Sequence, residues 1–146
     1  MARFKESVVI NQPVERVFAF VSDFENDPLW SGVAEVRRTS PGPLGVGTTF
    51  QLRQQFLGRR FDVALEVIRY EPSRVITVKT TSGRFVSMTG TRLAEPAGGA
   101  TQLTLLGTGH ARGVLRPLEP LLAAAAGGHR LRTQLGRLKQ ALEAQP

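Results

Sequence analysis

The chain has no cysteine among its 146 residues, and it has only one tryptophan and one tyrosine. The lack of cysteine excludes disulfides, thiolate metal sites and a cysteine nucleophile. The single tryptophan and tyrosine leave little for stacking on nucleic-acid bases. No run of apolar residues approaches the ~18 that a membrane-spanning helix requires, and the polar residues 2–6 do not resemble the apolar core of a signal peptide. We therefore expect a soluble, cytoplasmic protein.

The chain also has few acidic residues: it contains 12 acidic and 19 basic residues, which gives a net charge of +7. A nucleic-acid partner requires clustered cations. Here the basic residues are spread along the chain, and only the pairs Arg37-Arg38 and Arg59-Arg60 are adjacent. The distribution argues against nucleic-acid binding, whereas transient contact with an anionic membrane stays compatible with it.

The C-terminal residues 114–143 carry the clearest periodic signal. Apolar or small residues recur there at spacings of three and four, which predicts a long helix with one apolar face. This face needs a partner, and the middle of the chain offers strands rather than a second long helix. The members of the stripe are Leu121, Ala124, Gly128, Leu131, Leu135, Leu138 and Leu142.

The N-terminal part predicts a strand followed by two short helices. Residues 4–10 alternate as a strand, and Pro13 then begins a helix that Asn11 or Gln12 would cap. Asp27, which precedes a proline, repeats this pattern and predicts a second short helix.

Residues 33–105 predict a series of antiparallel strands whose register follows from the positions of the turns. A two-residue turn at residues 58–59 sets Phe50 opposite Val67. A turn at residues 82–83 sets Val78 opposite Ser87, and a turn at residues 95–99 sets Leu93 opposite Leu103. These registers place one apolar set of side chains on a single face and a polar set on the other.

The two sides of the predicted sheet carry further expectations. Gly107 and Gly109 would face the long helix, where the missing side chains allow either close packing or a cavity. The mostly polar outer face predicts a monomer, and an outward apolar cluster of Val75, Val86 and Met88 would support at most a weak dimer.

Several stretches together resemble one family. They are residues 10–18 (INQPVERVF), residues 21–30 (VSDFENDPLW), the turn at residues 41–47, the corner Tyr70-Glu71-Pro72 and the closing helix. They are similar to the SRPBCC superfamily, which includes START lipid-transfer domains, plant pathogenesis-related allergens and bacterial polyketide cyclase/dehydrase proteins. The resemblance covers nearly the whole chain and implies a single domain over residues 1–146.

The resemblance implies an α+β helix-grip fold. In this fold a curved seven-stranded antiparallel sheet surrounds a long C-terminal helix, with two short helices after strand 1 and a deep apolar cavity between. Because the family includes carriers, sensors and enzymes, the resemblance transfers no catalytic residue.

Strand parity then predicts which residues line such a cavity. The expected set mixes aromatic and aliphatic side chains with uncharged hydrogen-bonding groups, which suits a largely apolar ligand that carries a few oxygens. Core packing is the alternative role for the large residues, and hydrogen bonds to the backbone are the alternative for the hydroxyls. The predicted lining residues are Trp30, Gln54, Phe56, Phe61, Val63, Val78, Thr80, Phe85, Ser87, Thr89, Thr91 and Leu105.

Ionisable residues give few candidates for catalysis. Glu6 has inward parity and would serve as a general acid if burial raised its pKa, or else form a salt bridge at the margin of the sheet. His129 lies beside the leucine stripe and would face either the cavity or solvent. Neither it nor His110 has a third ligand at a recognisable spacing, so we predict no metal site and no cofactor.

The sequence therefore predicts binding of a small hydrophobic ligand, such as a lipid, sterol, quinone or aromatic polyketide, by a carrier or sensor. We favour binding over catalysis. Two alternatives stay open: an enzyme of the polyketide cyclase/dehydratase type, and an interaction module at a membrane surface.

Overall fold

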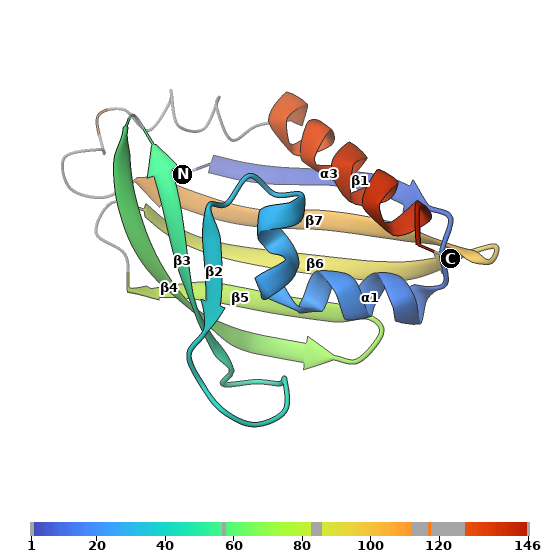
Figure 1. Cartoon of the computed structure of the whole chain (residues 1–146), viewed down its shortest axis with the longest axis horizontal. Coiled ribbons are helices and arrows are strands. Elements are labelled where there is room, and N and C mark those ends of the chain that lie inside the picture. Colours follow the sequence, from blue (N-terminus) through green and yellow to red (C-terminus); the bar gives the residue numbers. More distant parts are fainter. Residues whose placement is uncertain (1, 57, 83–85, 112–116, 118–127, 146) are drawn as a thin grey trace.

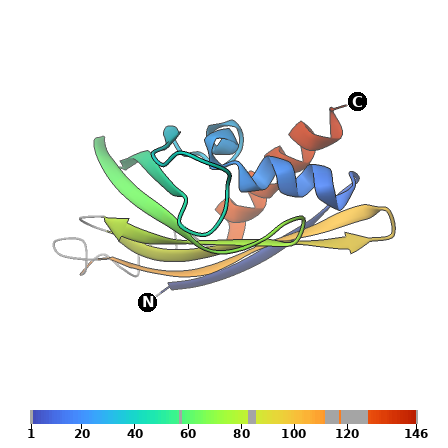
Figure 2. The same ribbon diagram turned by 90° about the horizontal axis from the view of Figure 1, so that it is seen from below.

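The computed structural model describes residues 2–56, 58–82, 86–111, 117 and 128–145. The strands form one seven-stranded antiparallel sheet in the order β1-β7-β6-β5-β4-β3-β2. The helices lie over one face of this sheet (Figure 1), which curves around them when seen from below (Figure 2). The strands are β1 (Ala2–Ile10), β2 (Glu35–Arg38), β3 (Thr49–Phe56), β4 (Arg59–Glu71), β5 (Val75–Ser82), β6 (Val86–Ala97) and β7 (Ala100–Ala111).

Three helices are described. They are α1 (Val14–Ser22), the 3-10 helix η1 (Phe24–Leu29) and α3 (Gly128–Glu143). The predicted α+β helix-grip architecture is thereby confirmed. The long helix was predicted to begin at residue 114, but residues 112–116 and 118–127 lie outside the described part of the chain.

The start of α1 differs from the prediction. Pro13 occupies the N-cap position and no side chain caps the helix, so the expected caps Asn11 and Gln12 are wrong. Gln12 instead donates its amide hydrogens to the carbonyls of Leu142 (2.9 Å) and Gln145 (3.2 Å). Carbonyls at a helix C-terminus lack partners within the helix, so this side chain ties the β1–α1 connection to the end of α3.

The second short helix begins earlier than the sequence indicated. Its N-cap is Asp23, whose carboxylate accepts from the backbone amide of Glu25 at 3.2 Å, and Pro28 lies inside the helix. Asp27 was expected to be the cap. Its side chain is buried and bonded elsewhere, as described below.

The β3–β4 register is shifted by two residues from the prediction. Phe50 pairs with Leu65 rather than Val67, and Phe56 pairs with Arg59, so the turn is one residue earlier than expected. Because the shift is even, the described side chains of the pair keep their predicted faces.

The β5–β6 register is shifted by an odd number of residues. Val78 pairs with Gly90 and not with Ser87, and the pairing between the two strands stops at Lys79 and Thr89. The two-residue turn predicted at residues 82–83 is therefore wrong. An odd shift moves every side chain of a strand to the other face, so the two faces of β6 are exchanged relative to the prediction.

A second odd shift follows between β6 and β7. Arg92 pairs with Leu105, and Ala94 pairs with Leu103, which was predicted to lie opposite Leu93. The two errors cancel, so Leu103 and Leu105 face the helices as predicted. Arg92 and Ala94 face them as well, which the sequence analysis did not expect.

The outward apolar cluster predicted for a weak dimer is not formed as expected. Val75 is buried. Met88 pairs with Gly109 and lies on the same face of β6 as Gly90, the side of the helices. The side chain of Val86 lies outside the described part of the structure.

Candidate functional site

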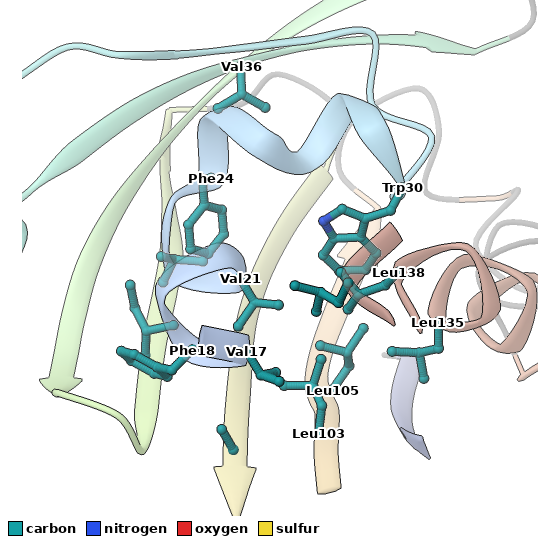
Figure 3. Packing of buried hydrophobic residues seen from close by; sticks show 14 of the residues in the cluster. Val17, Phe18, Val21, Phe24, Trp30, Val36, Leu103, Leu105, Leu135 and Leu138 are labelled. Atoms are coloured by element: carbon teal, nitrogen blue, oxygen red, sulfur yellow. The ribbon is translucent and has the colours of Figure 1, made fainter. Parts of the chain in front are cut away.

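The concave face of the sheet is closed at one end by a continuous apolar core, which we call the leucine end. There α1, η1 and the C-terminal half of α3 meet β6, β7 and the end of β1 (Figure 3). Leu138 and Leu142 of α3 and Val17 and Val21 of α1 have no exposed surface. Their i, i+4 spacings on each helix produce the two apolar stripes that meet here. The remaining members shown with labels are Phe18, Phe24, Trp30, Val36, Leu103, Leu105 and Leu135.

The other end of the same face carries small residues, and we call it the glycine end. It consists of Gly90, Gly107 and Gly109 with Met88 and Phe4, all of them half-buried. The register places Gly107 between Gly90 of β6 and Phe4 of β1.

Gly90 and Gly107 lack a side chain for different structural reasons. A Cβ on Gly107 would lie 2.3 Å from the carbonyl oxygen of Thr89 and 2.8 Å from Cζ of Phe4, so this glycine permits a close approach. A Cβ on Gly90 would meet, among the described residues, only Cε of Met88, at 3.5 Å. Close packing therefore explains Gly107, whereas no such close contact is found at Gly90 among the described residues.

A buried ion pair separates the two ends. Nη1 and Nη2 of Arg92 donate to Oδ1 and Oδ2 of Asp27 at 2.8 and 2.6 Å, and Nη1 also donates to the carbonyl of Val21 at 2.8 Å. The side chains are 14% and 3% exposed. The guanidinium carbon lies 3.9 Å from the ring centre of Phe24 and 5.0 Å from that of Trp30. Such a bidentate, charge-assisted contact fixes η1 to the sheet.

This pair was not predicted from the sequence. Thr91 was predicted to face inward, which by alternation put Arg92 on the outer face, and Asp27 was interpreted as a helix cap. A usable signal was present in the alternation of β6, because Arg92 shares its parity with the small residues Gly90 and Ala94. The misplaced turn assigned that set to solvent.

Trp30 was predicted to line the cavity, with core packing as the alternative. It is 1% exposed and lies at the end of η1 beside Leu138, so the structure shows it as part of the core. Its Nε1 has no hydrogen-bond partner among the described residues.

Four other predicted lining residues keep their predicted face. Val78 and Leu105 are buried in the apolar core, and Val63 is half-buried against it. Thr80 is half-buried, and its Oγ1 accepts from the backbone amide of Met88 at 3.1 Å. That hydroxyl keeps its own hydrogen available for a further acceptor.

The three hydroxyl-bearing residues of β6 that were predicted to line the cavity lie on the opposite face of the sheet. The observed register puts Ser87, Thr89 and Thr91 on the outer side of the sheet, where Thr91 shares a 2.8 Å hydrogen bond with Thr77. Because these three residues point away from the helices, they are not part of the candidate site.

The remaining predicted residues are exposed or not described. Gln54 pairs with Phe61 and is exposed. The side chains of Phe61 and Phe56, and all of Phe85, lie outside the described part of the structure.

The two catalytic candidates are not brought together by the described structure. Oε1 of Glu6 lies 3.4 Å from Nε of Arg132 on α3, with side chains 26% and 67% exposed. The salt bridge expected for Glu6 is thus confirmed. The side chain of His129 lies outside the described residues, and those that are described include no group of three potential metal ligands.

A second set of contacts ties α3 to β1. Oε2 of Glu143 accepts from Nζ of Lys139 (2.7 Å) and from the backbone amide of Asn11 (2.8 Å), and Nζ also donates to the carbonyl of Val9 (2.7 Å). The hydrogen bond from Lys139 is the main cause that lowers the pKa of Glu143 below its ordinary 4.5. None of the described helices is both long and apolar enough to cross a bilayer.

Comparison with known proteins agrees with this geometry. The chain belongs to the family described as polyketide cyclase / dehydrase and lipid transport, whose model matches residues 1–143. The SRPBCC resemblance is thereby confirmed. Among curated protein sequences, none matches the chain.

Solved structures share the fold at low sequence identity. The Zhui aromatase/cyclase from Streptomyces sp. R1128 aligns with a TM-score of 0.80 at 16% identity, over 97% of this chain and 93% of that one. A protein from Thermus thermophilus aligns with a TM-score of 0.76 at 19% identity, over 97% of both chains. The structure of Ara h 8.0201 aligns with a TM-score of 0.69 at 16% identity, over 96% of both chains.

Proposed function

We propose that the protein binds a small hydrophobic molecule between the glycine end of the sheet and the helices, as a carrier or sensor. One observation carries the proposal: the concave face is filled at the leucine end, whereas a Cβ on Gly90 at the other end would meet only Cε of Met88 among the described residues. A family that includes lipid transport by its description supports the same reading.

The driving force would be desolvation. Apolar ligand surface that moves out of water contributes about 25 cal/mol per Å² buried. The hydroxyl of Thr80 could orient such a ligand, since it lies on the concave face of β5 and has a hydrogen left to donate. Lipids, sterols, quinones and aromatic polyketides all combine a large apolar surface with a few oxygen atoms.

A titration with the neutral fluorescent probe N-phenyl-1-naphthylamine tests the proposal. The wild-type chain should bind the probe, and Gly90→Leu should weaken binding by about tenfold or more because its side chain fills the space above β6. Gly136→Leu is the matched control, since Gly136 is exposed on α3. Equal binding by both variants would contradict the proposed location.

Salt distinguishes this function from an interaction module at a membrane surface. Raising the ionic strength about tenfold should leave probe binding nearly unchanged, because the probe is uncharged and makes no ion pair that salt would screen. Binding only to anionic phospholipid vesicles, with a steep loss in salt, would favour the membrane-surface alternative and contradict the cavity.

A polyketide cyclase/dehydratase-type enzyme is the second candidate. It is favoured by the inward position of Glu6 on β1 and by the aromatase/cyclase among the structures with this fold. In that case Glu6→Gln should abolish turnover of a poly-ketone analogue while its binding persists. Turnover that survives the substitution would remove Glu6 from consideration.

A further inference from the structure

The two strands at the edges of the sheet differ in length and regularity. β2 forms one edge with four residues, whereas β1 forms the other with nine (Figure 1). All nine residues of β1 pair with β7 in one unbroken register, without a bulge or a proline. A long, regular edge strand carries a row of N–H and C=O groups on which a further strand can add.

The C-terminal part of the β1 edge is occupied by α3. The carbonyl of Val9 accepts from Nζ of Lys139 at 2.7 Å, and the backbone amide of Asn11 donates to Oε2 of Glu143 at 2.8 Å. These two contacts show that the odd-numbered residues of β1 direct their backbone groups away from β7.

The N-terminal part of the same edge has backbone groups that α3 does not take. The side to which backbone groups point alternates along an antiparallel strand, so Arg3, Lys5 and Ser7 point their N–H and C=O groups to the same side as Val9. None of these groups is hydrogen-bonded to another described residue. All three residues are exposed. Residues 3–7, which we call the docking edge, therefore offer hydrogen bonds to an added strand.

The docking edge is basic on its outer side. The register places Arg3 and Lys5 on the convex face of the sheet, and neither forms an ion pair with a described acidic residue. Residues directly opposite on neighbouring strands have Cβ atoms about 5 Å apart, and opposite charges at that distance stabilise the pair. An added strand with acidic side chains on this face would complement the two cations.

The same charges disfavour a second copy of the chain as the added strand. An antiparallel pair of two docking edges centred on Lys5 would put that lysine beside its own copy. Centring the pair on Phe4 would put Lys5 beside Arg3, and centring it on Glu6 would put two glutamates side by side. Like charges directly opposite are destabilising, so the edge rejects itself but accepts an acidic strand.

We infer that the docking edge binds an extended, acidic segment of a partner protein, which adds to β1 as an eighth strand of the sheet. The backbone groups of the edge supply the hydrogen bonds, and Arg3 and Lys5 select the acidic side chains. The inference is independent of the proposed ligand site, which lies on the concave face.

Two matched peptides test the choice of partner. The acetylated and amidated peptide Thr-Glu-Val-Glu-Val-Glu-Thr is the probe, and the control has lysine in place of each glutamate. The acidic peptide should bind at least about tenfold more tightly, because its charge pairs with the edge are attractive rather than repulsive. Methylation of alternate peptide nitrogens on the hydrogen-bonding side should abolish binding. No binding of the acidic peptide, or equal binding of both, would overturn the inference.

Amide hydrogen exchange locates the bound peptide. In the free chain the amides of Lys5 and Ser7 should exchange quickly, and those of Glu6 and Val8 slowly, because the latter two point toward β7. Saturating acidic peptide should slow Lys5 and Ser7 by about tenfold or more and leave the other two unchanged. Slow exchange of Lys5 and Ser7 without peptide would overturn the inference, because the edge would already be covered.

Charge reversal separates the docking edge from a general attraction to a basic protein. Lys5→Glu should weaken binding of the acidic peptide about five- to tenfold and strengthen binding of the lysine peptide. Lys79→Glu is the matched control, since Lys79 is exposed on the outer face of β5, three strands away, which is about 14 Å and beyond the screening length. Equal losses in the two variants would overturn the inference. Arg3→Glu provides a second variant of the edge if Lys5→Glu does not fold.

Discussion

The leucine end and the glycine end occupy one concave face, yet they are built from opposite kinds of residue. At the leucine end, large apolar side chains from α1, η1 and α3 meet over β7 and leave almost no exposed surface. At the glycine end, Gly90 and Gly107 pair across β6 and β7, and Met88, Gly109 and Phe4 beside them are half-buried. The difference teaches that the large buried side chains of the concave face are gathered at one end, and that the proposed ligand site lies at the other.

The ion pair between the ends should give the largest effect on stability. Asp27→Ala leaves the guanidinium of Arg92 buried without its partner and should lower the free energy of unfolding by about 3–5 kcal/mol. Urea denaturation measures this loss. The double variant Asp27→Leu/Arg92→Met removes both charges and should lose less than the single one. A single variant that loses under about 1 kcal/mol would show that the pair is not desolvated.

Side-chain truncation should sharpen the contrast between the two ends. Leu138→Ala removes a fully buried side chain of the leucine end and should cost about 2–5 kcal/mol, transfer and cavity terms together. Met88→Ala, at the glycine end, removes a half-buried side chain of similar size and should cost less than half as much. Equal losses in urea denaturation would contradict the division between the ends.

The two adjoining glycines should respond differently to one added methyl group. Gly107→Ala places a Cβ against the carbonyl of Thr89 and the ring of Phe4, and should destabilise the fold by about 1–3 kcal/mol. Gly90→Ala should change stability by about 0.5 kcal/mol or less, because its Cβ has room. Thermal unfolding of the pair measures the difference. The reverse order would show that Gly90 is the crowded position.

The smallest effect should come from acid titration at the C-terminal end of α3. The folded-state pKa of Glu143 is lowered, so the unfolded chain binds more protons on the acid side. The stabilisation from its contacts with Lys139 and Asn11 is present above the ordinary value of 4.5 and is lost as the pH falls through the lower folded-state value. Glu143→Gln should flatten this part of the dependence of melting temperature on pH. An unchanged slope would show that these contacts do not form in solution.

The architecture could be predicted because each element carries its own repeated signal. The 3.6-residue period of Leu131, Leu135, Leu138 and Leu142 identified α3, and alternation identified the strands. Such signals are redundant, so an error in one residue leaves the element recognisable.

The candidate site was predicted less well, because it depends on register rather than on the existence of elements. One misplaced turn after β5 exchanged the faces of β6, which put Thr89 and Thr91 inside and Arg92 outside. Side chains in a strand alternate with a period of two. A register error of an odd number of residues therefore exchanges the two faces, and the sequence pattern alone does not reveal it. The partnership of Arg92 with Asp27 spans a long sequence separation and leaves no local pattern at all.

The most direct test of the central claim is native mass spectrometry of the protein purified without detergent, followed by denaturing extraction of whatever it carries. We predict a stoichiometric apolar passenger. A protein that emerges empty, and whose melting temperature is unmoved by added fatty acids, sterols, quinones and aromatic polyketides, would contradict it, because the glycine end would then hold no ligand.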